Sequence, residues 1–226
     1  MTIRAIAWDV DGTLVDSEPL HHDALFAACG KWGVDISDIS DDEFRGVHMG
    51  DVWRALAPRM PASAREADWV QANDDYYVKH RNLLVPMPRA VETVRQLAQA
   101  GIAQICVSNA SRLILDANID ALGLQDVIEF SISIDDVGHG KPHPEPYATG
   151  CTRFGLKPHE VAAIEDSATG RRSARAAGLL VIAYDHLNEG VTDADHAIRD
   201  LALLPGLIRA HPAASIGVEL EGTGGA

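Results

Sequence analysis

The sequence contains little cysteine, few aromatic residues and no long apolar run. Its 226 residues include three cysteines, Cys29, Cys106 and Cys151, an odd number without a C-x-x-C pair. Neither a disulfide framework nor a cysteine-based zinc site is therefore expected, and we predict free thiols in a reducing, cytoplasmic setting. The first apolar run, at residues 3–8, ends at Asp9. It is too short for the apolar part of a signal peptide or for a membrane span.

Positive charge is also scarce. There are 19 Lys and Arg residues against 33 Asp and Glu residues, for a formal net charge of −14. An acidic surface repels nucleic acid and anionic membranes, so neither is an expected partner. We expect a monomer or weak dimer that acts on a small phosphorylated metabolite. Because a phosphate ester would be repelled too, its site needs local positive charge from a metal, a lysine or backbone N–H groups.

Short apolar runs alternate with helical patterns along most of the chain. The runs predict strands at residues 3–8, 102–107, 127–132, 161–164 and 179–183, and the patterns predict helices at 89–100, 111–122, 145–154 and 168–177. Apolar strands without strict alternation are typical of a parallel sheet that is covered on both faces. The fold class is therefore α/β, a doubly wound parallel sheet, with its ligand crevice at the carboxyl ends of the strands.

One long segment departs from this alternation. Between residues 17 and 84 only helical patterns occur, at 20–29, 42–45, 51–56 and 64–81. We predict an all-helical cap at residues 17–86, inserted into an α/β core formed by residues 1–16 and 87–226. The second junction is placed near Pro86 and Pro88, because prolines favour non-helical boundaries. The glycine-containing end, from about residue 215 to 226, is expected to be a flexible tail.

Two aspartates follow the first predicted strand, in the segment Asp9–Thr13. On extended backbone, Asp9 and Asp11 point to the same side, and they repel unless a cation lies between them. Gly12 allows a sharp turn that exposes N–H groups to an anion. A strand that simply ends in a capped turn would also carry aspartates, so this motif alone leaves both interpretations open.

Three further polar motifs follow later strands. They are Ser108-Asn109, Lys141 between a glycine and a proline, and Glu165-Asp166. Taken singly, they could be a helix N-cap, a solvent-exposed lysine and an acidic helix start. Together they converge on one edge of the sheet, which predicts a phosphate site with an oxygen-rich Mg²⁺ site beside it.

These four motifs resemble those of haloacid dehalogenase-like (HAD) hydrolases of the helical-cap branch, which includes phosphoglycolate phosphatases and β-phosphoglucomutase-like proteins. The resemblance extends from residue 3 to about residue 204. It implies that Asp9 attacks phosphorus and becomes a phosphoaspartate, while Asp11 acts as general acid and base. It also implies that Ser108 and Lys141 hold the phosphoryl group, with Gly12 and Asn109 beside them in the substrate site.

The same resemblance implies a magnesium ion. Its ligands would be Asp9, the backbone carbonyl of Asp11, and Asp166, with Glu165 either a further ligand or a partner of the ligands. Relatives that dehalogenate generally lack an acid at the position of Asp11, so its presence favours phosphate ester chemistry.

The cap helps to separate phosphatase from mutase. Similar phosphomutases carry basic residues where this chain has Met49 and Ala72. The expected function is therefore hydrolysis of a small sugar phosphate or phosphoglycolate, with a β-phosphoglucomutase-like activity as the alternative. A catalytically silent binding protein on the same fold is a remote alternative. A receiver domain is disfavoured because it needs no cap and carries its phosphorylated aspartate on a later strand.

Cap residues are the candidates for substrate contacts. Arg45, Gly46 and His48 lie in a loop that resembles the cap loop of such mutases, and His21 lies on the first cap helix. Solvated cap residues are the alternative interpretation, because histidines and arginines on helices and loops are commonly exposed.

Overall fold

A six-stranded parallel sheet forms the centre of the computed structural model, which describes residues 2–40, 43–44, 47 and 49–210. The strands are β1 (Ala5–Trp8), β4 (Ala103–Val107), β5 (Phe130–Ile132), β6 (Val161–Glu165), β7 (Leu180–Tyr184) and β8 (His196–Ile198). Their order in the sheet is β5-β4-β1-β6-β7-β8. The chain thus starts at the middle of the sheet, builds one side through β4 and β5, and then builds the other.

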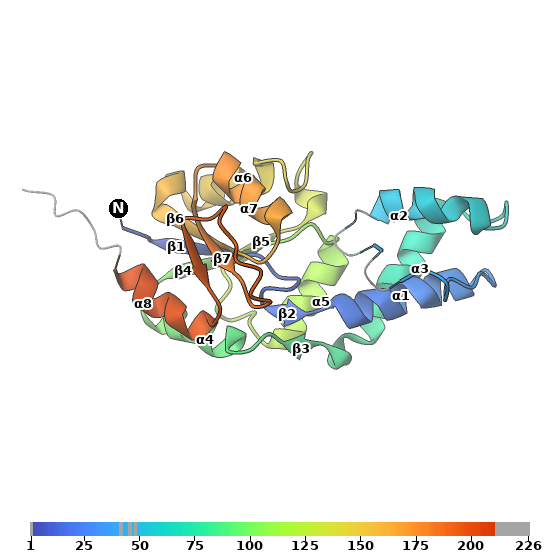
Figure 1. Cartoon of the computed structure of the whole chain (residues 1–226), viewed down its shortest axis with the longest axis horizontal. Coiled ribbons are helices and arrows are strands. Elements are labelled where there is room, and N and C mark those ends of the chain that lie inside the picture. Colours follow the sequence, from blue (N-terminus) through green and yellow to red (C-terminus); the bar gives the residue numbers. More distant parts are fainter. Residues whose placement is uncertain (1, 41–42, 45–46, 48, 211–226) are drawn as a thin grey trace, which may run out of the picture.

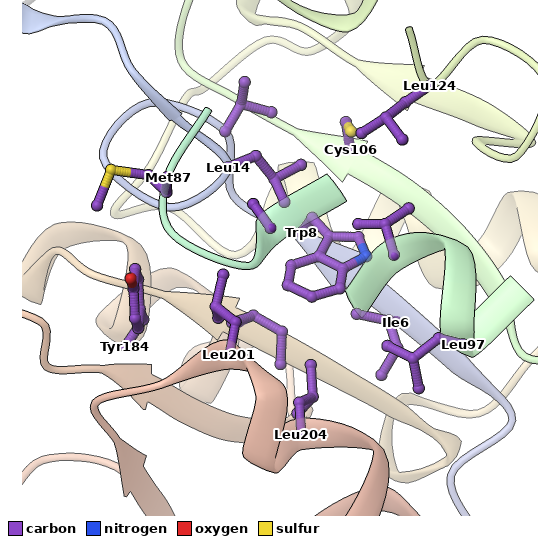
Figure 2. Packing of buried hydrophobic residues seen from close by; sticks show 14 of the residues in the cluster. Ile6, Trp8, Leu14, Met87, Leu97, Cys106, Leu124, Tyr184, Leu201 and Leu204 are labelled. Carbon is purple, nitrogen blue, oxygen red and sulfur yellow. The ribbon is translucent and has the colours of Figure 1, made fainter. Parts of the chain in front are cut away.

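Helices cover both faces of this sheet (Figure 1). On one face lie α4 (Ala90–Gln99), α5 (Arg112–Leu122) and α8 (Leu204–Arg209), and on the other lie α6 (Glu145–Phe154) and α7 (Ala168–Ala176). Alternate residues of a strand point to opposite faces. Ile6 and Trp8 of β1 accordingly pack in the apolar cluster under α4, α5 and α8. Ala5 and Ala7 pack in the cluster on the opposite face, under α6 and α7. Figure 2 shows Trp8 among buried side chains that include Leu97 of α4 and Leu204 of α8.

The predicted fold class is confirmed, and the strands of the central sheet differ from the prediction mainly at β5 and β8. The strand expected at residues 127–132 begins only at Phe130, because the N–H groups of Val127 and Ile128 both donate to the carbonyl of Leu124 in a turn. The edge strand β8 was not predicted. Of its three residues only Ile198 is buried, which is too little apolar signal for a periodic pattern.

Among the described residues, three α-helices lie between two short antiparallel strands, β2 (Val15–Asp16) and β3 (Val85–Pro86). The helices, here called the cap, are α1 (Glu18–Gly30), α2 (Met49–Leu56) and α3 (Glu66–Lys79). They lie together at one end of the molecule, beyond α5 (Figure 1). Trp69 and Leu56 are fully buried within the cap's own apolar cluster. The chain therefore enters and leaves the cap through two paired strands.

The predicted cap helices need some correction. The helix expected at residues 64–81 ends at Lys79, because His80 leaves helical geometry (ψ 15°) and the chain continues as a 3₁₀ turn, Arg81–Leu83. Of the helix expected at 42–45, residues 43–44 form a turn and the others lie outside the described residues. The remaining 3₁₀ turns are Ala57–Arg59, Ile134–Asp136, Pro158–Glu160 and Leu201–Leu203. Among the described helices, none has both the length and the apolar character needed to cross a membrane.

Candidate active site

The order of the strands brings the predicted motifs to one edge of the sheet. Asp9 follows β1, Ser108 follows β4 and Glu165 ends β6, and these three strands are neighbours with β1 in the middle. The connections from β1 run to one side of the sheet first and later to the other. This is the topological switch point of a doubly wound sheet, where the carboxyl ends of the strands open a crevice for ligands.

Lys141 lies between two buried carboxylates at this point. Its Nζ donates to Oδ1 of Asp9 and to Oε1 of Glu165, both at 2.6 Å, and to the carbonyl of Val107 at 2.8 Å. All three ammonium donors are therefore used, and the side chain is only 4% exposed. Burial would lower the pKa of Lys141, but the charges of the two carboxylates raise it above its ordinary value. Lys141 is thus a fixed cation beside Asp9.

Glu165 is fully buried, and its oxygens are already engaged by several donors. Besides Lys141, Tyr147 donates its hydroxyl to Oε1, and the Ser167 hydroxyl donates to Oε2 at 3.3 Å. Burial and the nearby acids raise the pKa of Tyr147, which keeps the phenol protonated as a donor. Of the two roles that the sequence left open for Glu165, these contacts favour that of a partner that holds Lys141.

Asp11 is held by donors from both the core and the start of the cap. Its Oδ1 accepts from Ser17 Oγ at 2.7 Å and Asn118 Nδ2 at 3.1 Å and lies 3.5 Å from His21 Nε2, while Oδ2 accepts from Ser108 Oγ at 3.0 Å. Burial alone would raise the pKa of Asp11, but the contacts with His21, Ser17 and Ser108 lower it to about 2. In turn, Asp11 outweighs the effect of burial on His21 and raises the pKa of that imidazole.

Three acids form a candidate metal site. Ligand atoms of Asp9, Glu165 and Asp166 all lie within 4.8 Å of one another. The pKa of Asp9 is raised by burial and by Glu165, and that of Asp166 is raised to about 6 by the same two causes. Lys141 alone therefore does not offset the negative charge at this edge. A hard divalent cation with oxygen ligands, such as Mg²⁺, would offset it, so the residues present fit that ion.

The turn after β1 makes room for these acids. Gly12 has a φ of +79°, and a Cβ there would lie 2.3 Å from Oδ2 of Asp166. The hydroxyl of Thr13 donates to Oδ1 of the same carboxylate at 3.3 Å. A glycine at position 12 therefore serves both the turn and the close approach of Asp166.

Of the other residues predicted to contact substrate, some lie at the site and some are not described by the structure. The side chain of Asn109 bonds the backbone of Lys141, and His21 lies against Asp11. Arg45, Gly46 and His48 lie outside the described residues.

A cleft of about 570 Å³ opens between the cap and the core. Its lining residues are Val47, Asp51, Asn109, Ile134, Val137, Gly138, Gly140, Lys141, Pro142 and Thr169.

Sequence reasoning missed Tyr147 and Asn118. Each is a polar residue on an otherwise apolar buried face of its helix, with Tyr147 beside Cys151 on α6 and Asn118 beside Ile114 and Leu115 on α5. A buried polar side chain needs a hydrogen-bond partner, so such a position is a usable signal. It does not identify the partner, because that depends on how the helices pack.

Comparison with known proteins identifies the family. The model of the haloacid dehalogenase-like hydrolases matches residues 3–178. A phosphoglycolate phosphatase from Thiobacillus denitrificans is 31% identical over 205 residues, which cover 86% of this chain and 90% of that protein. The chain therefore belongs to the haloacid dehalogenase-like hydrolases, as its motifs predicted.

Other relatives agree with this assignment. The validoxylamine A 7'-phosphate phosphatase of Streptomyces hygroscopicus subsp. limoneus is 27% identical, over 88% of this chain and 94% of that protein. Among solved structures, that of CbbY from Rhodobacter sphaeroides in complex with phosphate has a TM-score of 0.80 and 26% identity, over 90% of this chain and 96% of that one. The expectation of a hydrolase enzyme is thus confirmed, and the names of the relatives support a phosphatase.

Proposed function

We propose that this chain is a Mg²⁺-dependent phosphatase that hydrolyses a small phosphate monoester through a phosphoaspartate on Asp9. The observation that carries the proposal is the 2.6 Å bond from Lys141 Nζ to Oδ1 of Asp9 at the switch point of the sheet. It fixes the rotation of the carboxylate and places a cation where the phosphoryl charge would lie. Asp166 and Asp11 are the nearby groups that a metal-assisted phosphoryl transfer needs.

In the first step, an oxygen of Asp9 forms a bond to phosphorus as the ester P–O bond breaks. Asp11 donates a proton to the departing alcohol oxygen. In the second step, Asp11 takes a proton from a water molecule that attacks the phosphoaspartate, which releases inorganic phosphate and restores Asp9. Lys141 stays charged throughout and stabilises the negative charge that spreads over the phosphoryl oxygens.

The first step needs a protonated Asp11, although its contacts lower its pKa to about 2 in this structure. Ser108 offers a way to resolve this, because its hydroxyl donates to Oδ2 of Asp11 here. A phosphoryl group between Asp9 and Ser108 would take over that hydroxyl. The loss of the hydrogen bond and the arrival of phosphate charge would both raise the pKa of Asp11.

Asp9, Asp166 and the backbone carbonyl of Asp11 are the proposed magnesium ligands. When bound, the ion supplies positive charge that offsets the two carboxylates and the phosphoryl oxygens. Glu165 is not proposed as a ligand but as the residue that positions Lys141. Its oxygens already accept hydrogen bonds from the Lys141 ammonium, the Tyr147 hydroxyl and the Ser167 hydroxyl.

A substrate with a single phosphate, of the sugar phosphate or phosphoglycolate type, is favoured. Hexitol phosphatase B of Escherichia coli K12 is 29% identical over 77% of this chain, beside the phosphoglycolate phosphatase above. Among the described residues that line the cleft, Lys141 is the only cation, and Asp51, which lines it from the cap side, is already paired with Arg54. Met49 and Ala72 pack against the apolar cluster of the cap. These features do not favour the clamping of a second phosphate that a mutase needs.

Phosphate release from a panel of phosphorylated metabolites, with and without Mg²⁺, tests the proposal. The panel includes phosphoglycolate, hexose and pentose phosphates, hexitol phosphates, and β-glucose 1-phosphate with its bisphosphate activator. We expect Mg²⁺-dependent release that Asp9→Asn abolishes in a folded protein, and rapid-quench mass spectrometry that finds one phosphoryl group on Asp9. Isomerisation of glucose 1-phosphate without phosphate release would instead establish the mutase. Full turnover by Asp9→Asn would overturn the assignment.

A further inference from the structure

Two fully buried polar residues connect the cap to the carboxylate of Asp11. Tyr77, on cap helix α3, donates its hydroxyl to Oδ1 of Asn118 at 2.8 Å. Asn118, on core helix α5, donates its Nδ2 to Oδ1 of Asp11 at 3.1 Å. Neither Tyr77 nor Asn118 is exposed to solvent. Because buried polar groups are costly unless they are paired, two such residues in contact with each other and with a reacting group call for an explanation.

The direction of these hydrogen bonds matters. The side-chain amide of Asn118 has one accepting and one donating end, and only the donating end can bond a carboxylate. Burial and the charge of Asp11 raise the pKa of Tyr77. Its phenol therefore keeps its proton and donates to the carbonyl end of the amide, which turns the NH₂ group toward Asp11. If the hydroxyl of Tyr77 were absent, the amide would lose the contact that sets its orientation.

The position of Tyr77 depends on how the cap lies against the core. One turn earlier on α3, Oδ2 of Asp74 accepts from the Ser111 hydroxyl at the start of α5, at 3.0 Å. Helix α3 is thus joined to α5 by two hydrogen bonds, and the second of them ends at Asn118. The hydrogen bond from Asn118 to Asp11 therefore depends on the placement of the cap against the core that this structure shows.

The two oxygens of Asp11 differ in their surroundings. Ser17 and Asn118 donate to Oδ1, and His21 lies beside it, whereas Oδ2 accepts from Ser108, the residue expected to turn to the phosphoryl group. We propose that Asn118, oriented by Tyr77, is a positioning residue that holds Oδ1 of Asp11 so that Oδ2 faces the leaving-group oxygen. This inference rests on the proposed phosphatase function, and it adds that the cap contributes to acid catalysis through Tyr77.

Leaving-group dependence tests this inference. The value of kcat/KM covers the steps up to the first irreversible one, here transfer of the phosphoryl group to Asp9. Esters of poorly leaving alcohols need a proton from Asp11 in that step, whereas p-nitrophenyl phosphate does not. For Asn118→Leu, which keeps the volume and removes the donor, we expect kcat/KM to fall by about tenfold or more for alkyl phosphates. For p-nitrophenyl phosphate it changes little.

Tyr77→Phe removes a single hydroxyl and should change leaving-group dependence in the same direction, by a smaller factor. Tyr76→Phe, the same substitution at the neighbouring position of α3, is the matched control and should leave the dependence unchanged. Because Tyr77 acts through Asn118, the double variant should lose little more than Asn118→Leu alone. If Asn118→Leu does not fold, Tyr77→Phe carries the test.

The failures of this inference and of the proposed function can be told apart. Without turnover by the wild-type protein, or with full turnover by Asp9→Asn, the phosphatase itself is rejected. With an active wild type, an equal loss on aryl and alkyl esters in the folded variants would mean a structural role only. No loss on either ester would mean that Asp11 does not use this contact. Either of these two outcomes overturns the inference.

Discussion

Asn109 and Lys141 exchange two hydrogen bonds across 32 positions of the sequence. The N–H of Lys141 donates to Oδ1 of Asn109 at 2.7 Å, and Nδ2 of Asn109 donates to the carbonyl of Lys141 at 3.0 Å. A Cβ at Gly140 would lie 2.7 Å from the same Oδ1, so the glycine permits this approach. The amide of Asn109 thus ties the loop after β5 to the end of β4, and this contact sets where the Lys141 side chain begins.

Replacement of Asn109 by alanine should therefore reduce catalysis through Lys141. Both hydrogen bonds are lost, and the backbone of Lys141 is free to shift away from Asp9. Since a displacement of about 1 Å can lower a rate by about 100-fold, we expect kcat to fall by between 10- and 100-fold. Steady-state kinetics measures the loss, with Asn82→Ala, at an exposed position outside the site, as the control. A rise in KM with kcat unchanged would mean that Asn109 binds substrate, as the sequence suggested, and does not position Lys141.

Magnesium should stabilise the fold through Asp166. A ligand that binds only the folded state at 100 times its Kd stabilises it by about 2.7 kcal/mol. We expect Mg²⁺ to raise the midpoint temperature of thermal unfolding of the wild-type protein. In Asp166→Asn, Mg²⁺ should no longer raise it. Because burial and Glu165 raise the pKa of Asp166 to about 6, removal of its charge should also make the metal-free protein more stable.

Non-specific screening is the main competing explanation, because the chain carries a net charge of −14. NaCl at equal ionic strength measures that effect, and Asp23→Asn, at an exposed position of α1, removes one charge that does not belong to the acidic cluster. An equal response to Mg²⁺ in Asp166→Asn and in Asp23→Asn would place the ion elsewhere.

Much of the site could be predicted because its residues follow buried strands directly. Asp9, Ser108 and Glu165 each lie at the end of an apolar run, and the sheet brings such ends to one edge. The helical interruption after β2 was visible for a similar reason, because no apolar run of strand length occurs within it. Local sequence is sufficient where a residue's position in its element decides its position in space.

The contacts that could not be predicted all depend on packing between elements. Asn118 reaches Asp11 only because α5 presents that face to the turn after β1, and Tyr77 reaches Asn118 only because α3 lies on α5. Glu165 was expected at the site, but its bond from Tyr147 requires the rotation of α6. Periodicity shows which face of a helix is buried, but it does not show which residue of another element lies opposite.

Asp185 should contribute a pH-dependent part of the stability. Its carboxylate is 4% exposed and accepts from the N–H groups of Glu189 at 2.7 Å and Gly190 at 3.1 Å. Burial would raise its pKa, but these bonds outweigh burial and lower the pKa below its ordinary value. A carboxylate with a lowered folded-state pKa stabilises the fold above its unfolded pKa of about 3.9, and this contribution is lost as the pH falls through the folded value.

Urea unfolding of the wild-type protein and of Asp185→Asn between about pH 3 and pH 7 measures this contribution. Asp9, Asp11 and Asp166 are present in both proteins, so their effect on the pH dependence of stability cancels in the difference. We expect the wild type to be the more stable at neutral pH and the gap to shrink in acid. A gap that stays constant over this range would show that the charge of Asp185 plays no part.

Gly12 and Gly33 provide a matched pair that separates backbone strain from displacement of Asp166. Both have positive φ, +79° and +70°, but a Cβ at Gly12 would lie 2.3 Å from Oδ2 of Asp166, whereas a Cβ at Gly33 meets nothing within 4 Å. An alanine at either position should lose about 1–2 kcal/mol of stability from left-handed strain. Gly33→Ala should therefore be less stable and fully active.

Gly12→Ala should show the same strain and a second effect, because the methyl group pushes the Asp166 carboxylate away from Asp9. We expect kcat to fall by about 100-fold, and more Mg²⁺ should be needed for half-maximal activity. Urea unfolding and magnesium titration of both variants separate the two effects. If Gly12→Ala matched Gly33→Ala in kcat and in magnesium dependence, the close approach of Asp166 to this turn would not be needed, and the glycine would serve the turn alone.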